Sequence, residues 1–241
     1  MKKFPKILVG GPVSDHHDYC YEEFIKSVKN LTYKNFDVFF VDNSKTDDFY
    51  NKIKKDFPST SKITYNKNVK IRLAESRELV RKKVIGENYD YLFCLDQDVV
   101  PPKDVIERLM ENGRHIVTGI YYNNYTKLNP VTNEYEQRKL PVVWVKSLKD
   151  PNKLVSIRKD IIESGELIKI DSCGTGCILI HRDVLEKIKF RWEEDKEGVD
   201  DVFFCIDALN FGYEIYADTS VICQHLFEGR PINWGEGDMK F

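Results

Sequence analysis

Two acidic side chains stand one residue apart directly after the strongest candidate strand in the chain. The apolar run 89–95 predicts a buried strand, and Asp96 and Asp98 follow it at once. Two carboxylates beside a hydrophobic strand are costly unless a cation neutralises them. Mg²⁺ and Mn²⁺ bind carboxylate oxygens and keep positions open for diphosphate oxygens. The pattern favours a divalent metal site, whereas the competing interpretation is a turn in which Asp96 caps the next helix.

Further polar groups are expected near the same two aspartates. Asp42 follows the apolar run 37–41, and the segment Gly10–Gly11 follows the apolar run 7–9. Ligands of parallel sheets bind beyond the carboxyl ends of the strands, so these groups should converge on one crevice. His225 stands in a late apolar run, 221–226. The residues alone leave it open whether His225 is a core residue or a metal ligand.

A second acidic pair, Asp200 and Asp201, opens a helix predicted over 200–211. Acidic residues at a helix start commonly cap it and stabilise its dipole. A carboxylate there could instead act as a general base toward an acceptor hydroxyl. The segment Gly174-Thr175-Gly176 is equally a tight turn or a place where backbone amides approach a ligand.

Strand and helix alternate over the first 120 residues, which predicts an α/β fold with a mostly parallel sheet covered on both faces. The second half is less regular. We expect an ordered loop over 121–136, a charged flap over 146–166, and a mobile lid or a tail over 227–241. The expected strands are 7–9, 37–41, 63–65, 89–95, 115–120, 140–145, 214–217 and 221–226, and the segment 168–180 holds residues 171–176 before a further apolar strand. The expected helices are 21–31, 49–57, 73–85, 101–110, 182–188 and 200–211.

Composition narrows the class of protein. The 241 residues include 37 Lys plus Arg and 39 Asp plus Glu, which gives a formal net charge of -2. A chain with this balance has no overall positive potential that would attract nucleic acid. No apolar run reaches the roughly 18 residues that a membrane span needs. The six cysteines are scattered without a CxxC pair, and most sit in apolar runs as reduced residues do. We expect a cytoplasmic protein, with peripheral membrane contact left open.

Several segments match one family in the right order, and the sequence resembles the family-two-like GT-A glycosyltransferases of the nucleotide-diphospho-sugar transferase superfamily. The resemblance covers about residues 6–226. Its segments are Ile7-Leu8-Val9 with the loop after it, Val41-Asp42-Asn43-Ser44, Ala74-Glu75-Ser76-Arg77, Tyr91-Leu92-Phe93-Cys94-Leu95-Asp96-Gln97-Asp98, Gly174-Thr175-Gly176-Cys177-Ile178-Leu179-Ile180, Asp200-Asp201 with Gly212-Tyr213, and Gln224-His225-Leu226.

The resemblance implies a GT-A fold and a role for each matching residue. Residues 1–120 would form the nucleotide-sugar half, and residues 121–241 the acceptor half of the same single domain. On the nucleotide side would lie Gly11, Pro12 and Val13 at the base, Asp42 at the base or ribose, Arg77, and Asp96 near the ribose and metal. Asp98, Asp96 and His225 would hold Mn²⁺ or Mg²⁺, Asp201 beside Asp200 would be the base of an inverting transfer, and Gly174, Thr175, Gly176 and Trp144 would face the sugars.

The chain departs from the family in the helix that carries the expected base. The pair is Asp200-Asp201 where Glu-Asp is usual, and Phe203 and Asp207 stand where an acid and an arginine are common. These departures leave the base, and therefore inversion, open. The expected donor is a UDP- or GDP-sugar, and the acceptor could be a glycan, a lipid or a small molecule.

Three alternatives remain beside this interpretation. A sugar nucleotidyltransferase has a similar sheet, but it would carry basic residues in its first glycine-rich loop, and Gly10-Gly11-Pro12 has none. A non-catalytic nucleotide- or carbohydrate-binding protein would keep the fold without turnover. A metal-dependent phosphohydrolase would need more metal ligands than the sequence places together.

Overall fold

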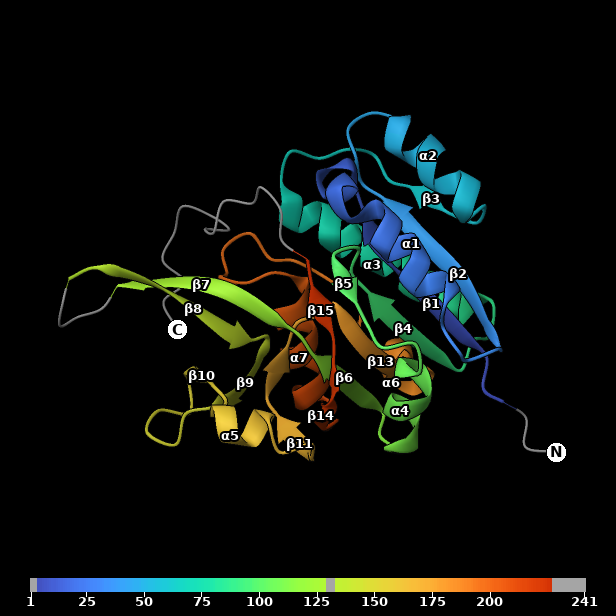
Figure 1. Cartoon of the computed structure of the whole chain (residues 1–241). Helices are drawn as coiled ribbons and strands as arrows, with labels where there is room; N and C mark the ends of the chain where they lie inside the picture. The colour runs from blue at the N-terminus through green and yellow to red at the C-terminus, as the bar shows by residue number, and fades with distance from the viewer. Residues whose placement is uncertain (1–3, 129–132, 227–241) are drawn as a thin grey trace.

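The computed structural model describes residues 4–128 and 133–226, and their centre is an eight-stranded sheet (Figure 1). Four of its seven neighbouring pairs are parallel and three are antiparallel. From edge to edge the strands are β11 (Leu167–Ile170), β14 (Ile215–Ile222), β6 (Ile116–Ile120), β13 (Cys177–His181), β4 (Tyr91–Leu95), β1 (Ile7–Val13), β2 (Phe36–Asp42) and β3 (Ser61–Lys62).

Helices cover both faces of this sheet, as predicted. Alternate residues of a strand point to opposite faces, so Ile7 and Val9 join one core while Leu8 joins the other. The first core packs under α1 (Tyr21–Lys29), α2 (Asp48–Asp56) and α4 (Val105–Glu111). The second packs under α3 (Val69–Gly86), α6 (Arg182–Lys187) and α7 (Asp200–Asn210). The α/β class is therefore confirmed.

The short elements surround the ends of the sheet. A 3-10 helix, η1 (Asp15–Cys20), follows β1, and β5 (Val99–Val100) pairs with β15 (Gln224–His225). A three-stranded sheet combines β10 (Leu154–Ser156), β9 (Val143–Lys146) and β12 (Ser172–Cys173), and α5 (Lys159–Ile162) follows β10. Among the described residues, no helix is both long and apolar enough to cross a membrane.

Strand direction explains why segments that are distant in sequence meet at one rim of the sheet, where the strand ends lie. Because β13 runs antiparallel to β4, its first residue Cys177 pairs with Leu95, the last residue of β4. The segment before β13 therefore meets the turn after β4. Because β14 runs parallel to β6, its last residue Ile222 pairs with Ile120, and β15 continues beyond the same edge. Segments from both halves of the chain thus contribute to one rim.

The first strand is longer than the sequence suggested. It was expected to end at Val9 before a loop at Gly10–Gly11, but β1 continues to Val13 with every residue buried. A Cβ at Gly10 would collide with the carbonyl oxygen of Phe39, and one at Gly11 would lie 2.5 Å from that of Leu95. The two glycines let β1 pass closely between its neighbours.

Two other expectations were wrong in the second half. The loop expected over 121–136 is instead a hairpin of β7 (Tyr122–Leu128) and β8 (Tyr135–Pro141), which projects from the body in Figure 1. The separate strands at 214–217 and 221–226 are one strand, β14, followed by β15. The flap expected over 146–166 contains β10 and α5. The lid or tail expected over 227–241 lies outside the described residues.

The glycines of β1 give a direct test of this packing. Gly11→Ala should lower the free energy of unfolding by about 2–3 kcal/mol, since the new methyl group overpacks against the carbonyl of Leu95. Gly86→Ala is the matched control, because its Cβ would meet no atom within 4 Å. The control should be neutral or stabilising by up to about 1 kcal/mol. Equal urea midpoints for the two variants would contradict the close approach.

Candidate functional site

The rim beyond the carboxyl ends of β1, β2 and β4 brings together most of the candidate residues. Val13 pairs with Asp42, so both lie at this rim. Asp96 follows β4, and its backbone N–H donates to the carbonyl of Gly176 over 3.1 Å. The acidic turn therefore contacts the glycine segment that precedes β13, as the convergence of strand ends predicts.

Arg77 links the two acidic pairs. One terminal nitrogen of its guanidinium lies 2.6 Å from Asp96, and the other lies 2.8 and 3.0 Å from the two oxygens of Asp200. The side chain of Asp200 is fully buried and that of Arg77 is 5% exposed. Burial acts to lower the pKa of Arg77, but Asp200 and Asp96 raise it well above its ordinary value. The guanidinium is thus a permanent cation between these carboxylates.

Asp201 lies beside this buried pair in the first turn of α7. Its Oδ1 accepts the backbone N–H of Val202 over 2.7 Å. Burial, and then the charge of Asp200, raise the pKa of Asp201 to about 7. A carboxyl group with a pKa near neutrality is suited to general-base chemistry, because it can take a proton and return it at working pH.

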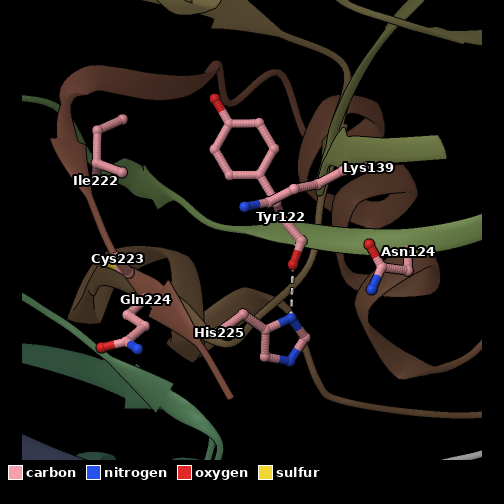
Figure 2. A pocket seen from close by; sticks show the side chains of 7 residues that line it. All are labelled: Tyr122, Asn124, Lys139, Ile222, Cys223, Gln224 and His225. Atoms are coloured by element: carbon pink, nitrogen blue, oxygen red, sulfur yellow. Dashed lines mark hydrogen bonds between the residues drawn. The ribbon is translucent and has the colours of Figure 1, made fainter. Parts of the chain in front are cut away.

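Asp98 faces two histidines. Its Oδ2 lies 3.1 Å from Nε2 of His225 and 3.6 Å from Nε2 of His17. Nδ1 of His225 lies 2.7 Å from the carbonyl oxygen of Tyr122 (Figure 2). A carbonyl can only accept, so Nδ1 donates its proton to it, and Nε2 is the ring atom that faces Asp98. A cation between that nitrogen and the carboxylate would satisfy both, and a backbone carbonyl on the other nitrogen is typical of metal-binding histidines.

His17 and Gln97 were missed by the sequence analysis. Gln97 is the middle residue of the acidic turn and is 2% exposed. Its side chain accepts the N–H of Ser14 and donates to the carbonyl of His17, each over 2.9 Å. The turn after β4 therefore holds η1 against itself. The only local signal was the position of His16-His17 shortly after β1, and this does not distinguish the two histidines.

The glycine segment fits closely against the acidic turn. A Cβ at Gly176 would lie 2.9 Å from the Tyr121 ring and 3.1 Å from Oδ2 of Asp96, and a Cβ at Gly174 would collide with the Tyr121 hydroxyl. That hydroxyl accepts the N–H of Gly176 over 3.1 Å, and Thr175 is 2% exposed. Tyr121 is therefore buried beneath the segment.

Several other candidate residues are buried or half-buried and are not exposed at a binding surface. Asp42 is fully buried, and its Oδ1 accepts both the backbone N–H and the hydroxyl of Ser44, while Lys62 lies 3.5 Å from its Oδ2. Gly11, Pro12 and Val13 are buried within β1. Trp144 is half-buried in β9, opposite Ser172 of β12, and packs against the first core.

A pocket of about 350 Å³ adjoins the Asp98 cluster, because His225 belongs to both (Figure 2). Its size is at the lower end of ligand pockets. The hairpin contributes Tyr122, Asn124 and Lys139, and residues 222–225 form the other wall. Lys139 lies over the Tyr122 ring at 5.2 Å. The pocket thus places the ammonium group of Lys139, the ring of Tyr122 and two side-chain amides beside His225.

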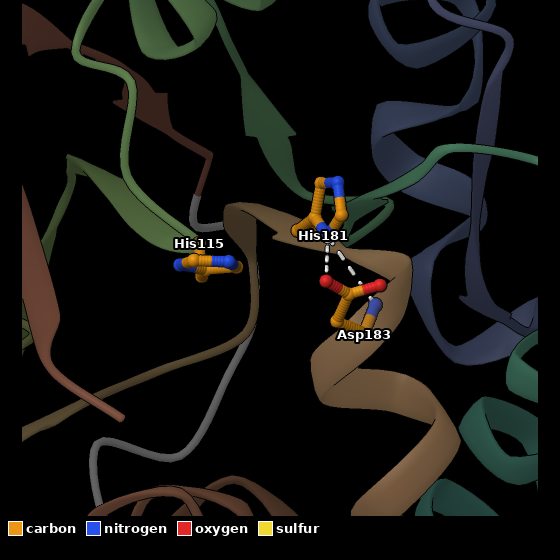
Figure 3. A group of neighbouring side chains, drawn as sticks. All are labelled: His115, His181 and Asp183. Carbon is orange, nitrogen blue, oxygen red and sulfur yellow. Dashed lines mark hydrogen bonds and ion pairs between the residues drawn. The ribbon is translucent and has the colours of Figure 1, made fainter. Parts of the chain in front are cut away.

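A separate group of possible metal ligands lies at the other end of the central strands, away from the rim that holds Asp96 (Figure 3). His115, His181 and Asp183 bring one ligand atom each within 4.8 Å of one another. His181 pairs with Tyr91, the first residue of β4, so this group lies a strand length away from Asp96. Its Nδ1 already accepts the N–H of Asp183 and caps α6. Capping and ring packing hold these side chains together.

The cysteines pack inside the protein. All six are buried, and none of them forms a disulfide bond. Cys173 contacts Cys205, and the sulfur of Cys177 lies 3.4 Å from that of Cys223. The cysteines Cys173 and Cys177 therefore pack against separate partners, as small buried hydrophobic residues do.

Comparisons with known proteins give the family and the fold. The model of glycosyl transferase family 2 matches residues 21–189. That span contains Asp42, Arg77, Asp96, Asp98 and the glycine segment, while Asp201 and His225 lie beyond it. A comparison with curated proteins finds no match. Among solved structures, the crystal structure of A197 from STIV has a TM-score of 0.50 and 19% identity, over 92% of this chain and 86% of that chain. At that identity the likeness speaks for the fold.

The Arg77 link predicts a large effect on stability. Arg77→Met should cost about 3–5 kcal/mol in the free energy of unfolding, since it leaves two carboxylates without their cation. The double variant Arg77→Met with Asp200→Asn should recover part of that loss. Lys82→Met, an exposed change on the same helix, is the control. Urea unfolding measures all three, and a loss from Arg77→Met no larger than the control's would refute the link.

Proposed function

The chain belongs to glycosyl transferase family 2, and we propose that it is a metal-dependent enzyme that moves a sugar from a nucleoside-diphosphate sugar to an acceptor hydroxyl with inversion. The grouping of Asp96, Asp98 and Asp201 at one rim carries this proposal. Arg77 joins Asp96 to the helix that begins with Asp200 and Asp201. Binding groups from the first half of the chain therefore adjoin a carboxyl group from the second half that is suited to act as a base.

Residues 1–120 provide the nucleotide-sugar half in this proposal, and residues 121–241 the acceptor half of one GT-A domain. Gly11, Pro12, Val13 and Asp42 shape the floor beneath the base and ribose, as expected from their burial at the ends of β1 and β2. Arg77 serves the nucleotide side by fixing Asp96. The donor is a UDP- or GDP-sugar, and the acceptor is a glycan, a lipid or a small molecule. We place the reaction in the cytoplasm, where buried thiols stay reduced.

Asp98 and His225 would hold the divalent cation, Mn²⁺ or Mg²⁺, together with Asp96. These residues fit a cation because Nε2 of His225 and an oxygen of Asp98 lie 3.1 Å apart, while a backbone carbonyl fixes the other ring nitrogen. Asp96 keeps Oδ2 near the glycine segment while Oδ1 contacts Arg77. When bound, the cation offsets charge that develops on the leaving diphosphate.

Asp201 accepts the acceptor's proton in this mechanism. The acceptor oxygen then bonds to the anomeric carbon from the face opposite the diphosphate, as the bond from that carbon to the diphosphate oxygen breaks. Gly174, Thr175 and Gly176 shape the floor near the transferred sugar. Trp144 and the pocket beside His225 lie on the acceptor side.

Nucleotide binding should depend on the metal and on Asp98. We expect UDP or GDP to bind about tenfold or more tightly with Mn²⁺ than without, and Asp98→Ala to remove that gain. Asp195→Ala, an exposed change, should bind like the unmodified chain. Calorimetric titration measures each case. No metal-dependent binding of either nucleotide would end the glycosyltransferase proposal, and binding without turnover on any acceptor would indicate a binding protein.

The pH dependence should report on Asp201. Its raised pKa means that the carboxylate needed by a base forms as the pH rises, so kcat/KM should increase through about pH 7. Asp201→Asn should lower kcat by about 10²–10⁴-fold and flatten that limb, with nucleotide affinity unchanged. Steady-state rates from pH 5 to pH 9 test this. An Asp201→Asn variant that keeps its rate would place the base elsewhere or favour a retaining mechanism.

A further inference from the structure

We propose that the group formed by His115, His181 and Asp183 binds a divalent transition-metal ion such as Zn²⁺ (Figure 3). Each of the three residues offers one ligand atom, and these atoms all lie within 4.8 Å of one another. The group shares no residue with the rim that holds Asp98, and it lies at the other end of β13 and β4. This ion would therefore be additional to the one proposed for the reaction.

The two histidines are neighbours across adjacent strands. β6 and β13 are antiparallel, with Ile116 paired to Ile180, and the next pair outward consists of His115 and His181. The backbone N–H of His181 donates to the carbonyl of His115 over 2.8 Å, which extends the pairing by one residue. Opposite side chains of an antiparallel pair lie on the same face of the sheet, so the pairing itself brings the imidazoles together. Their ring centroids are 5.2 Å apart.

The first turn of α6 adds the carboxylate. Asp183 follows His181 by two residues, and its Oδ2 lies 3.5 Å from Nδ1 of that ring. Two ligand atoms about 2.1 Å from one ion lie about 3.4 Å apart at a tetrahedral angle. The hydroxyl of Tyr213 donates to the backbone carbonyl of Asp183 over 3.0 Å, and its ring centroid lies 5.8 Å from that of His115. One tyrosine therefore contacts both the helix turn and the first histidine.

A cation would compensate two atoms whose lone pairs face the same space. Nδ1 of His181 accepts the backbone N–H of Asp183, so this nitrogen carries a lone pair. At 3.3 Å that bond is longer than most N–H hydrogen bonds, so it competes weakly with an ion. No lysine or arginine in the described part of the chain forms an ion pair with Asp183, and the adjacent Arg182 pairs with Glu186 instead.

The ligand types decide which ions bind. Two imidazoles and one carboxylate form a known ligand set for Zn²⁺, with water in the open position. Mg²⁺ prefers oxygen ligands and should not bind here. The side chains of His181 and Asp183 are 29% and 58% exposed, so the ion would be open to solvent. A separation of 4.8 Å is slightly more than two bonds of about 2.1 Å, and the exposed side chain of His115 can rotate to close it.

Calorimetric titration of Zn²⁺ into the Asp98→Ala variant tests this group alone, because that change removes a ligand at the rim. We expect this variant to bind Zn²⁺ and not Mg²⁺. Adding His115→Ala should weaken Zn²⁺ binding about tenfold or more, since it removes one of three ligands. Adding His16→Ala, which removes another exposed histidine, should leave binding unchanged. His115 is the better choice for substitution, because the ring of His181 also caps α6.

The visible spectrum of bound Co²⁺ gives a second readout, because it responds to the ligands themselves. His115→Ala and Asp183→Asn should each change this spectrum, whereas His16→Ala should not. Urea unfolding without metal checks that each variant is folded. Equal Zn²⁺ binding by the His115→Ala and His16→Ala variants, or no Zn²⁺ binding to Asp98→Ala, would overturn the assignment. Neither result bears on nucleotide binding, whose dependence on Mn²⁺ and Asp98 tests the proposed function separately.

Discussion

One buried guanidinium holds the two halves of the site together. Arg77 stands on α3 and contacts Asp96 from the first half of the chain and Asp200 from the second. Asp200 is fully buried and needs a cation beside it, and the planar fork of arginine reaches both Asp200 and Asp96. Arg77 therefore links the acidic turn after β4 to the first turn of α7. Asp201 adjoins this link, and burial first, and then the charge of Asp200, raise its pKa.

Much of the fold could be predicted because its central strands are continuous apolar runs. The runs at β2 and β4, with helices between them, were recognisable from residue type alone, and Phe24, Ile25 and Val28 mark the buried side of α1. The hairpin β7–β8 could not be predicted this way. Both of its faces carry polar residues, so it lacks the apolar alternation that identifies a strand. The extent of β1 was missed for another reason, since its glycines are explained only by Phe39 and Leu95, which lie far along the chain.

The candidate site, like the fold, could be predicted from the sequence only in part. The convergence of Asp96, Asp98 and His225 could be anticipated, because strand ends of an α/β sheet share one rim. The contacts of Gln97 with Ser14 and His17 could not, since they join polar atoms across 80 or more residues without any local pattern. Likewise, a motif can single out Arg77 without revealing which carboxylates it neutralises. Those pairings belong to the tertiary structure.

The attachment of the hairpin to His225 has a thermodynamic consequence. Tyr122, the first residue of β7, holds the ring of His225 through its carbonyl and also lines the adjoining pocket. Seven register pairs connect β7 to β8, so a shift of Tyr122 is shared by the whole ladder. An ion that requires His225 in its present orientation therefore favours one position of the hairpin. By reciprocity, a ligand whose affinity depends on that position must change the affinity of the ion by the same factor.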